Sequence, residues 1–116
     1  MIDKLAYNQP YTYKAIVTAV YDGDSFTCDI DLGFNSWIMN QKMRLLYLDT
    51  PEIRGDERSD GIKVRDIVRD MILNKEVIIH TKKDEKGKYG RWLCEVTIGE
   101  LNLNTWLLEN KYAKPY

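Results

Sequence analysis

The sequence predicts an α+β fold that is mainly β: a five-stranded barrel with two helices, in the order β-β-β-α-β-β-α. Three observations lead to this prediction. The chain has 116 residues, the size of one domain, so 1–116 is taken as a single unit. Five short segments alternate apolar and polar residues or are rich in β-branched side chains, as strands are. One longer segment between the third and fourth of them changes to the helical repeat.

Two strands joined by a tight turn are predicted after a polar lead-in at residues 1–12. Residues 13–20 are rich in β-forming side chains, and the Asp22-Gly23 pair behind them is a strong signal for a hairpin turn. Residues 25–32 alternate regularly, which places four apolar side chains on one face: Phe26, Cys28, Ile30 and Leu32.

The middle of the chain is predicted to hold a long strand, a loop and a helix. After a turn at residues 33–36, residues 37–48 continue as one third strand. The charged segment 49–60 contains Pro and Gly and is typical of a loop. Residues 61–73 then place apolar side chains at helical spacing: Val64, Ile67, Val68, Met71 and Ile72.

The C-terminal part adds two strands and a short helix. The run 77–81 is rich in β-branched residues, and residues 92–98 alternate again after a charged turn. Apolar spacing predicts a final helix that contains Leu103, Trp106 and Leu107. Five strands with a helix between the third and fourth are the arrangement of the Greek-key OB-fold barrel.

Composition limits the classes of function. The net charge is −1 and the pI is near 5.8, which argues against a strongly basic protein that binds nucleic acid by charge alone. The net charge does not exclude a local basic site on an otherwise neutral surface. No apolar run approaches the ~20 residues of a membrane span, and the first residues lack the apolar part of a signal peptide. We therefore expect a monomer that is not bound to membranes and is intracellular by default, with secretion open if the start of the sequence was removed.

The two cysteines, Cys28 and Cys94, are far apart and not in a metal-binding spacing. Each falls on the apolar face of a predicted strand. Because free cysteine is among the most buried residue types, we predict two buried free thiols, with a disulfide as the alternative.

Acidic residues gather where predicted strands end. Asp22 and Asp24 lie at the first turn, and Asp49 and Glu52 follow the third strand. If the first three strands form a meander, both places lie at one end of the sheet. Clustered carboxylates with a backbone carbonyl suit a hard cation such as Ca²⁺ or Mg²⁺. The alternative for Asp22-Gly23 is a hairpin turn without a ligand.

Two arginines are the other candidate site residues. Arg44 lies among apolar residues of the third strand, and Arg91 precedes the fifth. A guanidinium matches a carboxylate or a phosphate with two parallel hydrogen bonds. Two arginines and a metal can clamp a phosphoryl group while a further carboxylate positions water. Taken singly, Arg44 in a structural salt bridge and Arg91 as a solvated charge stay open, and His80, the only histidine, is interpreted as structural.

Three segments, in this order, resemble the signature segments of the staphylococcal nuclease (thermonuclease) family: VYDGDS at 20–25, RLLYLDTPE at 44–52 and KYGR at 88–91. The segment LNTWLLENKYAK at 103–114 is similar to the closing helix and turn of that family. The resemblance covers about residues 13–114. Ser25 stands where the family usually has Thr, and Gly87 stands where it has an acid, with Asp84 and Glu85 nearby.

The resemblance implies an OB-fold, Ca²⁺-dependent phosphodiesterase that acts on DNA and RNA. By motif position, the implied calcium ligands are Asp24, Asp49 and the carbonyl of Thr50, with Asp22 near the metal. The implied catalytic residues are Arg44 and Arg91, which would hold the scissile phosphate, and Glu52, the candidate general base. The implied substrate-binding residues are Lys88 and Tyr89, which match residues that contact a terminal phosphate.

Two rival functions belong to other classes. OB-folds often serve as non-catalytic nucleic-acid-binding modules, which need exposed aromatic side chains in a basic groove. Four tyrosines could stack on bases, although most are expected in the barrel wall: Tyr11, Tyr13, Tyr21 and Tyr47. A protein-interaction domain with an incidental acidic cluster leaves both arginines unexplained. The complete set of metal and phosphate residues favours an active nuclease.

Overall fold

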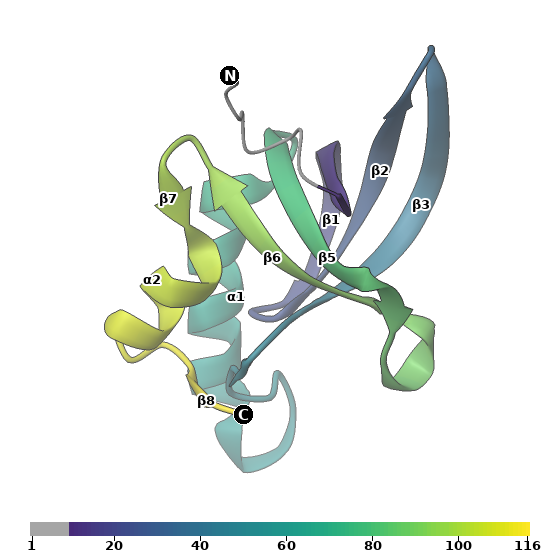
Figure 1. Ribbon diagram of the computed structural model, residues 1–116. Helices are drawn as coiled ribbons and strands as arrows, with labels where there is room; N and C mark the ends of the chain where they lie inside the picture. The colour runs from purple at the N-terminus through teal and green to yellow at the C-terminus, as the bar shows by residue number, and fades with distance from the viewer. Residues whose placement is uncertain (1–9) are drawn as a thin grey trace.

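The computed structural model describes residues 10–116 and shows a β-barrel with two helices packed against it (Figure 1). Most of the predicted lead-in, residues 1–9, lies outside the described range, and the first strand already begins at Thr12. The elements in chain order are β1 (Thr12–Asp22), β2 (Ser25–Gly33), β3 (Ser36–Leu45), β4 (Leu48–Asp49), the 3-10 helix η2 (Gly55–Glu57), α1 (Arg58–Ile72), β5 (Glu76–Lys86), the 3-10 turn η3 (Lys88–Gly90), β6 (Trp92–Ile98), β7 (Leu101–Asn102), α2 (Leu103–Glu109) and β8 (Lys114–Pro115).

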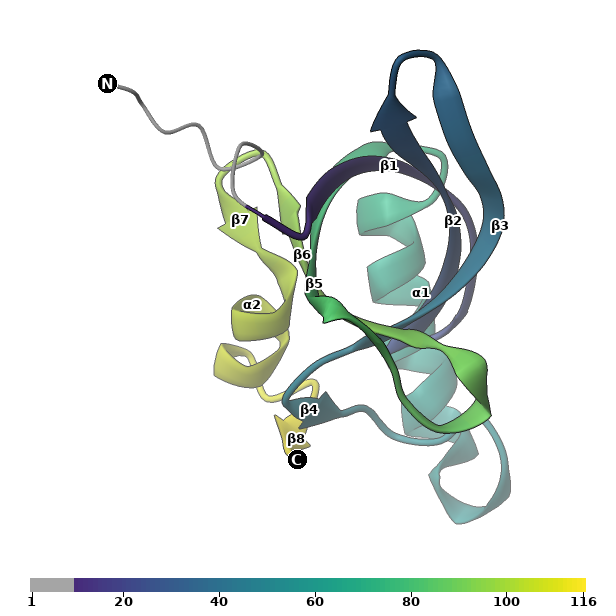
Figure 2. The ribbon, with the colours of Figure 1, turned by 45° about the vertical axis from the view of Figure 1, so that its right-hand side comes forward.

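Five long strands close into the barrel. Their order is β3-β2-β1-β5-β6, and β6 also pairs with β3. The β3–β6 pairing is parallel and joins Met43 to Trp92 and Leu45 to Cys94, whereas the other barrel pairings are antiparallel. Figure 2 shows the strands curving around a common interior. The predicted α+β Greek-key OB-fold with two helices is therefore confirmed.

The core follows the two sequence periods. Alternate residues of the strands point inward, and Phe26, Cys28, Met43 and Val96 are almost fully buried. The helix α1 begins at Arg58, three residues before the predicted start, and it buries one stripe of its surface: Gly61, Val64, Val68 and Ile72. Full burial of one such aliphatic side chain stabilises the fold by roughly 1.5–3 kcal/mol.

The prediction of one continuous strand over residues 37–48 is wrong at its C-terminal end. The strand β3 ends at Leu45, and Tyr47 adopts a positive φ of 72°, which breaks the extended conformation. The short strand β4 then pairs with the C-terminal strand β8, with Leu48 opposite Pro115. Because this partner lies far along the sequence, the local pattern shows only one apolar run.

The first predicted turn is present, and its glycine is needed for space. Asp22 and Ser25 pair across the turn, so Gly23 and Asp24 are its two central residues. A Cβ atom on Gly23 would lie 2.7 Å from Cγ1 of Val64 and 2.8 Å from Cγ2 of Thr50. The turn is therefore packed directly against α1 and against the residue that follows β4.

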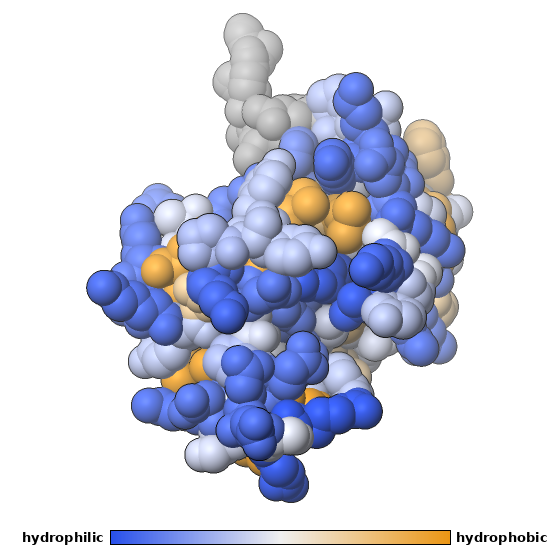
Figure 3. Space-filling model, turned by 90° about the horizontal axis from the view of Figure 1, so that it is seen from below, coloured by the Kyte–Doolittle hydropathy of each residue, from blue (hydrophilic) through white to orange (hydrophobic). Residues whose placement is uncertain are grey.

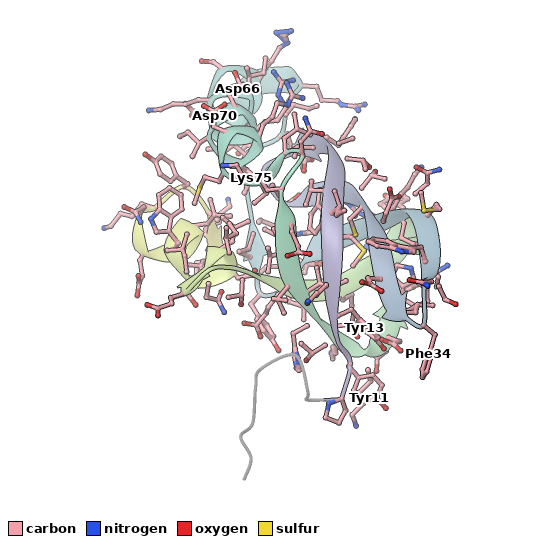
Figure 4. All side chains as sticks on the ribbon, turned by 90° about the horizontal axis from the view of Figure 1, so that it is seen from above. Tyr11, Tyr13, Phe34, Asp66, Asp70 and Lys75 are labelled. Atoms are coloured by element: carbon pink, nitrogen blue, oxygen red, sulfur yellow. The ribbon has the colours of Figure 1, made fainter. Side chains whose placement is uncertain are left out.

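The hairpin of β2 and β3 extends past the rim of the barrel, as Figure 1 shows. For this reason Leu32, which was expected on the buried face with Ile30, is 44% exposed. The connecting residues Phe34 and Asn35 both have positive φ, as in the tight turns that join hairpins. The side chain of Phe34 points away from the fold (Figure 4).

Both cysteines are buried and free, as predicted. Cys28 lies on β2 and Cys94 on β6. Within residues 10–116, neither helix has the length and apolar character needed to cross a lipid bilayer.

Candidate active site

The ends of three strands and one turn meet at one mouth of the barrel. The turn between β1 and β2 carries Asp22 and Asp24, and the last residues of β3 carry Arg44. The strand register pairs Ser25 with Arg44, and the amide of Leu45 donates to the carbonyl of Asp24 at 2.9 Å. These backbone contacts bring the acidic turn beside the arginine, as the sequence analysis expected.

The guanidinium of Arg44 is held between two carboxylates. Its Nη1 lies 3.1 Å from Oδ2 of Asp24, and its Nη2 donates to Oδ1 of Asp49 at 2.6 Å. Nη1 also donates to the backbone carbonyls of Leu45 and Leu48, at 3.0 and 3.1 Å. Only 14% of the side chain of Arg44 is exposed, so the charge is fixed in place by its partners. The structural salt bridge considered for Arg44 is thus present in the structure.

Arg91 joins the same network through a serine. Its Nη1 donates to Oγ of Ser25 at 2.6 Å, and that hydroxyl donates to Oδ1 of Asp24 at 3.3 Å. The Nε atom of Arg91 is buried and has no hydrogen-bond partner in the described part of the chain, so not all donors of this arginine are used. The linking role of Ser25 was not predicted, because its position next to Asp24 is the one feature of the sequence that points to it.

The two turn aspartates lie in unlike environments. Asp24 is buried, and its Oδ2 accepts a hydrogen bond from the amide of Thr50 at 3.1 Å. Asp22 accepts a hydrogen bond from the amide of Asp24 at 3.1 Å. Burial, together with a side-chain hydrogen bond to Asp24 and the negative charge of Asp24, raises the pKa of Asp22 to about 7, although the amide hydrogen bond acts in the opposite direction. The charged form of Asp22 is therefore disfavoured, because it is partly desolvated and lies beside the negative charge of Asp24.

The donor set has the chemistry of a hard-cation site. Asp24 and Asp49 supply carboxylate oxygens, Asp22 adds a third nearby, and the hydroxyl of Thr50 is buried without a partner. Calcium prefers such oxygen ligands. Across the described residues, no three side chains of His, Cys, Asp or Glu are arranged so that they could hold a metal ion, and Arg44 bridges Asp24 and Asp49. The donor types are those of a hard cation, which would have to compete with Arg44 for Asp24 and Asp49.

Glu52 does not join this network. It lies on the exposed loop before α1, where its amide donates to Oε1 of Glu57 at 3.0 Å. Its own carboxylate makes no hydrogen bond or ion pair within residues 10–116. The charge of Glu52 is therefore unpaired among the described residues.

Lys88 and Tyr89 lie on the exposed turn η3, outside the hydrogen-bonded network. Tyr89 is 86% exposed, and its ring centre lies 5.5 Å from Cζ of Arg91. Asp84, an acid near this segment in the sequence, instead bonds Thr81 and Tyr13. It is therefore no part of the site.

A second aromatic side chain, which was not predicted from the sequence, lies at the site. The ring centre of Tyr116 lies 5.7 Å from Cζ of Arg44, because pairing of β8 with β4 brings the C-terminal segment to the mouth. Figure 3 views the molecule from below, the side on which β4, β8 and the loop before α1 lie in Figure 1. That surface is mainly hydrophilic, with small hydrophobic areas between.

The fold and the site together define an OB-fold barrel with an arginine–carboxylate cluster at its mouth. A family model described as staphylococcal nuclease homologue matches residues 42–116 of the sequence. The chain therefore belongs to the staphylococcal nuclease family. The resemblance seen in the three sequence segments is confirmed.

Two curated relatives extend the comparison beyond the family model. The chain is 30% identical over 106 residues to a thermonuclease of Staphylococcus hyicus, across 89% of this chain and 58% of that protein. It is 31% identical over 129 residues to an uncharacterized protein of Methanocaldococcus jannaschii, across 90% of this chain and 59% of that protein. The chain thus spans a little under three fifths of the length of these relatives.

Proposed function

We propose that this chain is a calcium-dependent phosphodiesterase that hydrolyses DNA or RNA and acts as a single-domain monomer. Membership of the staphylococcal nuclease family supports a nuclease. The observation that carries the proposal is the continuous network from Arg91 through Ser25 and Asp24 to Arg44. Two guanidinium groups anchored around one carboxylate form a preorganised receptor for a phosphodiester.

The roles divide between cation and phosphate. Asp24, Asp49 and the carbonyl of Thr50 would hold Ca²⁺, with Asp22 beside it. When bound, the cation supplies a positive charge that neutralises the phosphate and stabilises charge that develops on it. Arg44 and Arg91 bind the non-bridging oxygens of the scissile phosphate by charge-assisted hydrogen bonds. Arg44 has to exchange a carboxylate contact for the phosphate.

Glu52 is the proposed general base. Its free carboxylate is available to accept a proton from the attacking water, and a glutamate reaches further than the two aspartates. Lys88 and Tyr89 are proposed to contact a second, terminal phosphate of the bound nucleotide, because both project from the turn next to Arg91.

Digestion of plasmid and single-stranded substrates tests the function directly. The purified chain is incubated with each substrate in the presence of Ca²⁺, Mg²⁺ or EDTA, beside the Arg91→Ala variant prepared in the same way. We expect cleavage with Ca²⁺, none with EDTA, and strong loss in the variant, which excludes a contaminating nuclease. Binding of single strands without cleavage under every condition would identify a binding module instead.

A further inference from the structure

A groove of about 430 Å³ opens beside the arginine network on the outer surface of β1, β2 and β3. Ser25 and Arg91 line one part of the groove, and Thr27 and Lys42 line another. The strand register orders these residues, because Ser25 pairs with Arg44 and Thr27 pairs with Lys42. The groove therefore leads away from the proposed phosphate site along the sheet.

The charges in the groove suit a second phosphate. Lys42 and Arg44 are two residues apart on β3, so their side chains share a face and are separated by roughly 7 Å along the strand. This is close to the spacing of successive phosphates in an extended single strand. Lys42 is exposed and makes no hydrogen bond or ion pair in the described part of the chain.

An aromatic side chain borders the same groove. Tyr21 is 55% exposed, and its hydroxyl accepts a hydrogen bond from Nη2 of Arg54 at 2.6 Å. This bond restrains the orientation of the ring. An exposed, oriented aromatic ring beside a basic groove is the arrangement on which single-stranded bases stack.

The groove has room for one nucleotide step. Beyond Thr27, the next outward residue of β2 is Asp29, whose carboxylate accepts a hydrogen bond from the amide of Asn40 at 2.8 Å. A carboxylate at that point repels a further phosphate. Lys88, Tyr89 and Tyr116 do not line the groove, so it is separate from the subsite proposed above.

We propose that this groove binds the nucleotide adjacent to the scissile phosphate of a single-stranded nucleic acid. Its base stacks on Tyr21, and its outer phosphate pairs with Lys42. The inference rests on the proposed nuclease function, because Arg44 and Arg91 define where the scissile phosphate lies.

The test compares two substrates. A short single-stranded oligothymidylate occupies the groove, whereas bis(para-nitrophenyl) phosphate is a phosphodiester without any nucleotide. Lys42→Ala and Tyr21→Ala should each lower kcat/KM for the oligonucleotide about fivefold or more, mainly through KM. Turnover of bis(para-nitrophenyl) phosphate should stay within about twofold, since neither side chain reaches the reacting phosphate.

Two variants serve as controls. Lys75→Ala removes a lysine from the segment after α1, where its Nζ donates to the carbonyl of Asp70 (Figure 4). This variant should hydrolyse both substrates like the wild type. Tyr21→Phe keeps the ring and should keep most of the affinity. Fluorescence anisotropy of the labelled oligonucleotide in EDTA adds a salt series, in which Lys42→Ala should make the slope of log K against log salt shallower by about 0.7.

The outcomes separate the groove from the catalytic function. If the wild type hydrolyses both substrates and Lys42→Ala and Tyr21→Ala leave oligonucleotide kinetics unchanged, the groove inference is wrong and the nuclease function stands. Equal losses on both substrates also overturn the groove, because they show damage to the phosphate site. If the wild type hydrolyses neither substrate, the nuclease proposal fails. In that case the anisotropy series still tests the groove, and an oligonucleotide affinity and salt slope in Lys42→Ala equal to those of the wild type would overturn it.

Discussion

Gly61 of α1 lies directly against the backbone carbonyl of Glu52. A Cβ atom at position 61 would overlap with that carbonyl group and would lie 2.8 Å from the amide nitrogen of Ile53. The first turns of the helix thus form the surface on which the loop with the proposed general base rests. The glycine is required here by close approach of two backbones, which the helical pattern of the sequence does not reveal.

Replacing Gly61 by alanine should move this loop. We expect Gly61→Ala to lower the free energy of unfolding by about 1–3 kcal/mol through overpacking. The displaced Glu52 should also reduce kcat by a factor on the order of 10². Urea unfolding and steady-state cleavage measure the two effects, with Ser59→Ala, an exposed substitution on the same helix, as the control. A variant with the stability and kcat of the wild type would contradict the proposed contact.

The two arginines should be equally important for catalysis and unequal for stability. Arg44→Ala and Arg91→Ala should each lower kcat/KM by a factor on the order of 10² to 10⁴, and lysine should restore little, because it lacks the planar fork. Arg44→Ala also leaves two carboxylates without their partner and should cost roughly 3–5 kcal/mol, whereas Arg91→Ala breaks a bond to a neutral serine and should cost about 1 kcal/mol.

Cleavage rates and urea unfolding check both statements. Arg65→Ala, which removes an arginine paired with Asp66 on α1, provides the matched control and should retain activity. Unchanged kinetics in both alanine variants would remove the arginines from the mechanism.

The local sequence pattern was sufficient to predict the buried face of a strand or helix, because that face follows from the repeat of apolar residues within the element. The inward residues of β2, Phe26, Cys28 and Ile30, follow from alternation, and the buried stripe of α1 follows from helical spacing. The local pattern does not predict features that depend on pairing with a distant segment. The break at Tyr47 depends on pairing of β4 with the C-terminal β8, which no local period encodes. The expectation that most of the four tyrosines lie in the barrel wall is wrong, since Tyr11, Tyr21 and Tyr47 are 42%, 55% and 56% exposed.

In the site, too, some features follow from the order of the strands and others depend on tertiary packing. The acidic turn and the end of β3 come together because neighbouring strands of a meander pair, which the sequence order already suggests. The bridge by Ser25 and the placement of Tyr116 beside Arg44 arise from tertiary packing and were missed. The hydrogen-bonded network therefore limits the proposed phosphate site to fewer residues than the sequence segments do.

The buried thiols should be unreactive in the folded protein. Burial raises the pKa of Cys28 to about 12 and also raises the pKa of Cys94. Because the thiolate is the reactive form, a thiol reagent at pH 8 should modify neither cysteine in the native chain and both after unfolding in urea. Titration of free thiols by absorbance measures this, and rapid native labelling of either cysteine would contradict the burial.

The ionisation of Asp22 should make calcium-free stability depend on pH. Its pKa is about 7 in the folded chain and near 3.8 in the unfolded chain, so the folded state binds the proton more tightly between these values. The free energy of unfolding contributed by Asp22 should therefore decrease as pH rises from about 4 to about 7. Asp22→Asn should remove this dependence, whereas Asp70→Asn on the exposed side of α1 should not. Thermal unfolding in EDTA across this range tests it, and parallel pH profiles for wild type and Asp22→Asn would refute it.

Asp24 and Glu52 should separate metal binding from proton transfer. Asp24→Asn replaces a charged oxygen ligand by a neutral one, so it should weaken calcium binding as well as turnover. Glu52→Gln should keep calcium affinity within a few-fold and slow turnover by on the order of 10² or more, as expected for loss of a general base. Isothermal titration with Ca²⁺ and a nucleotide inhibitor, beside steady-state cleavage rates, measures both quantities.

The contacts of Asp24 require one more control in this comparison. Asp24 also binds Arg44, Ser25 and the amide of Thr50, so Asp24→Asn needs a thermal unfolding curve to show that the mouth of the barrel still folds. Glu52→Gln changes a carboxylate that has no partner among residues 10–116, and the variant should unfold like the wild type. If Glu52→Gln abolishes calcium binding, Glu52 is a ligand and the base lies elsewhere. If neither variant affects cleavage, the carboxylates take no part in hydrolysis and the proposed catalytic function fails.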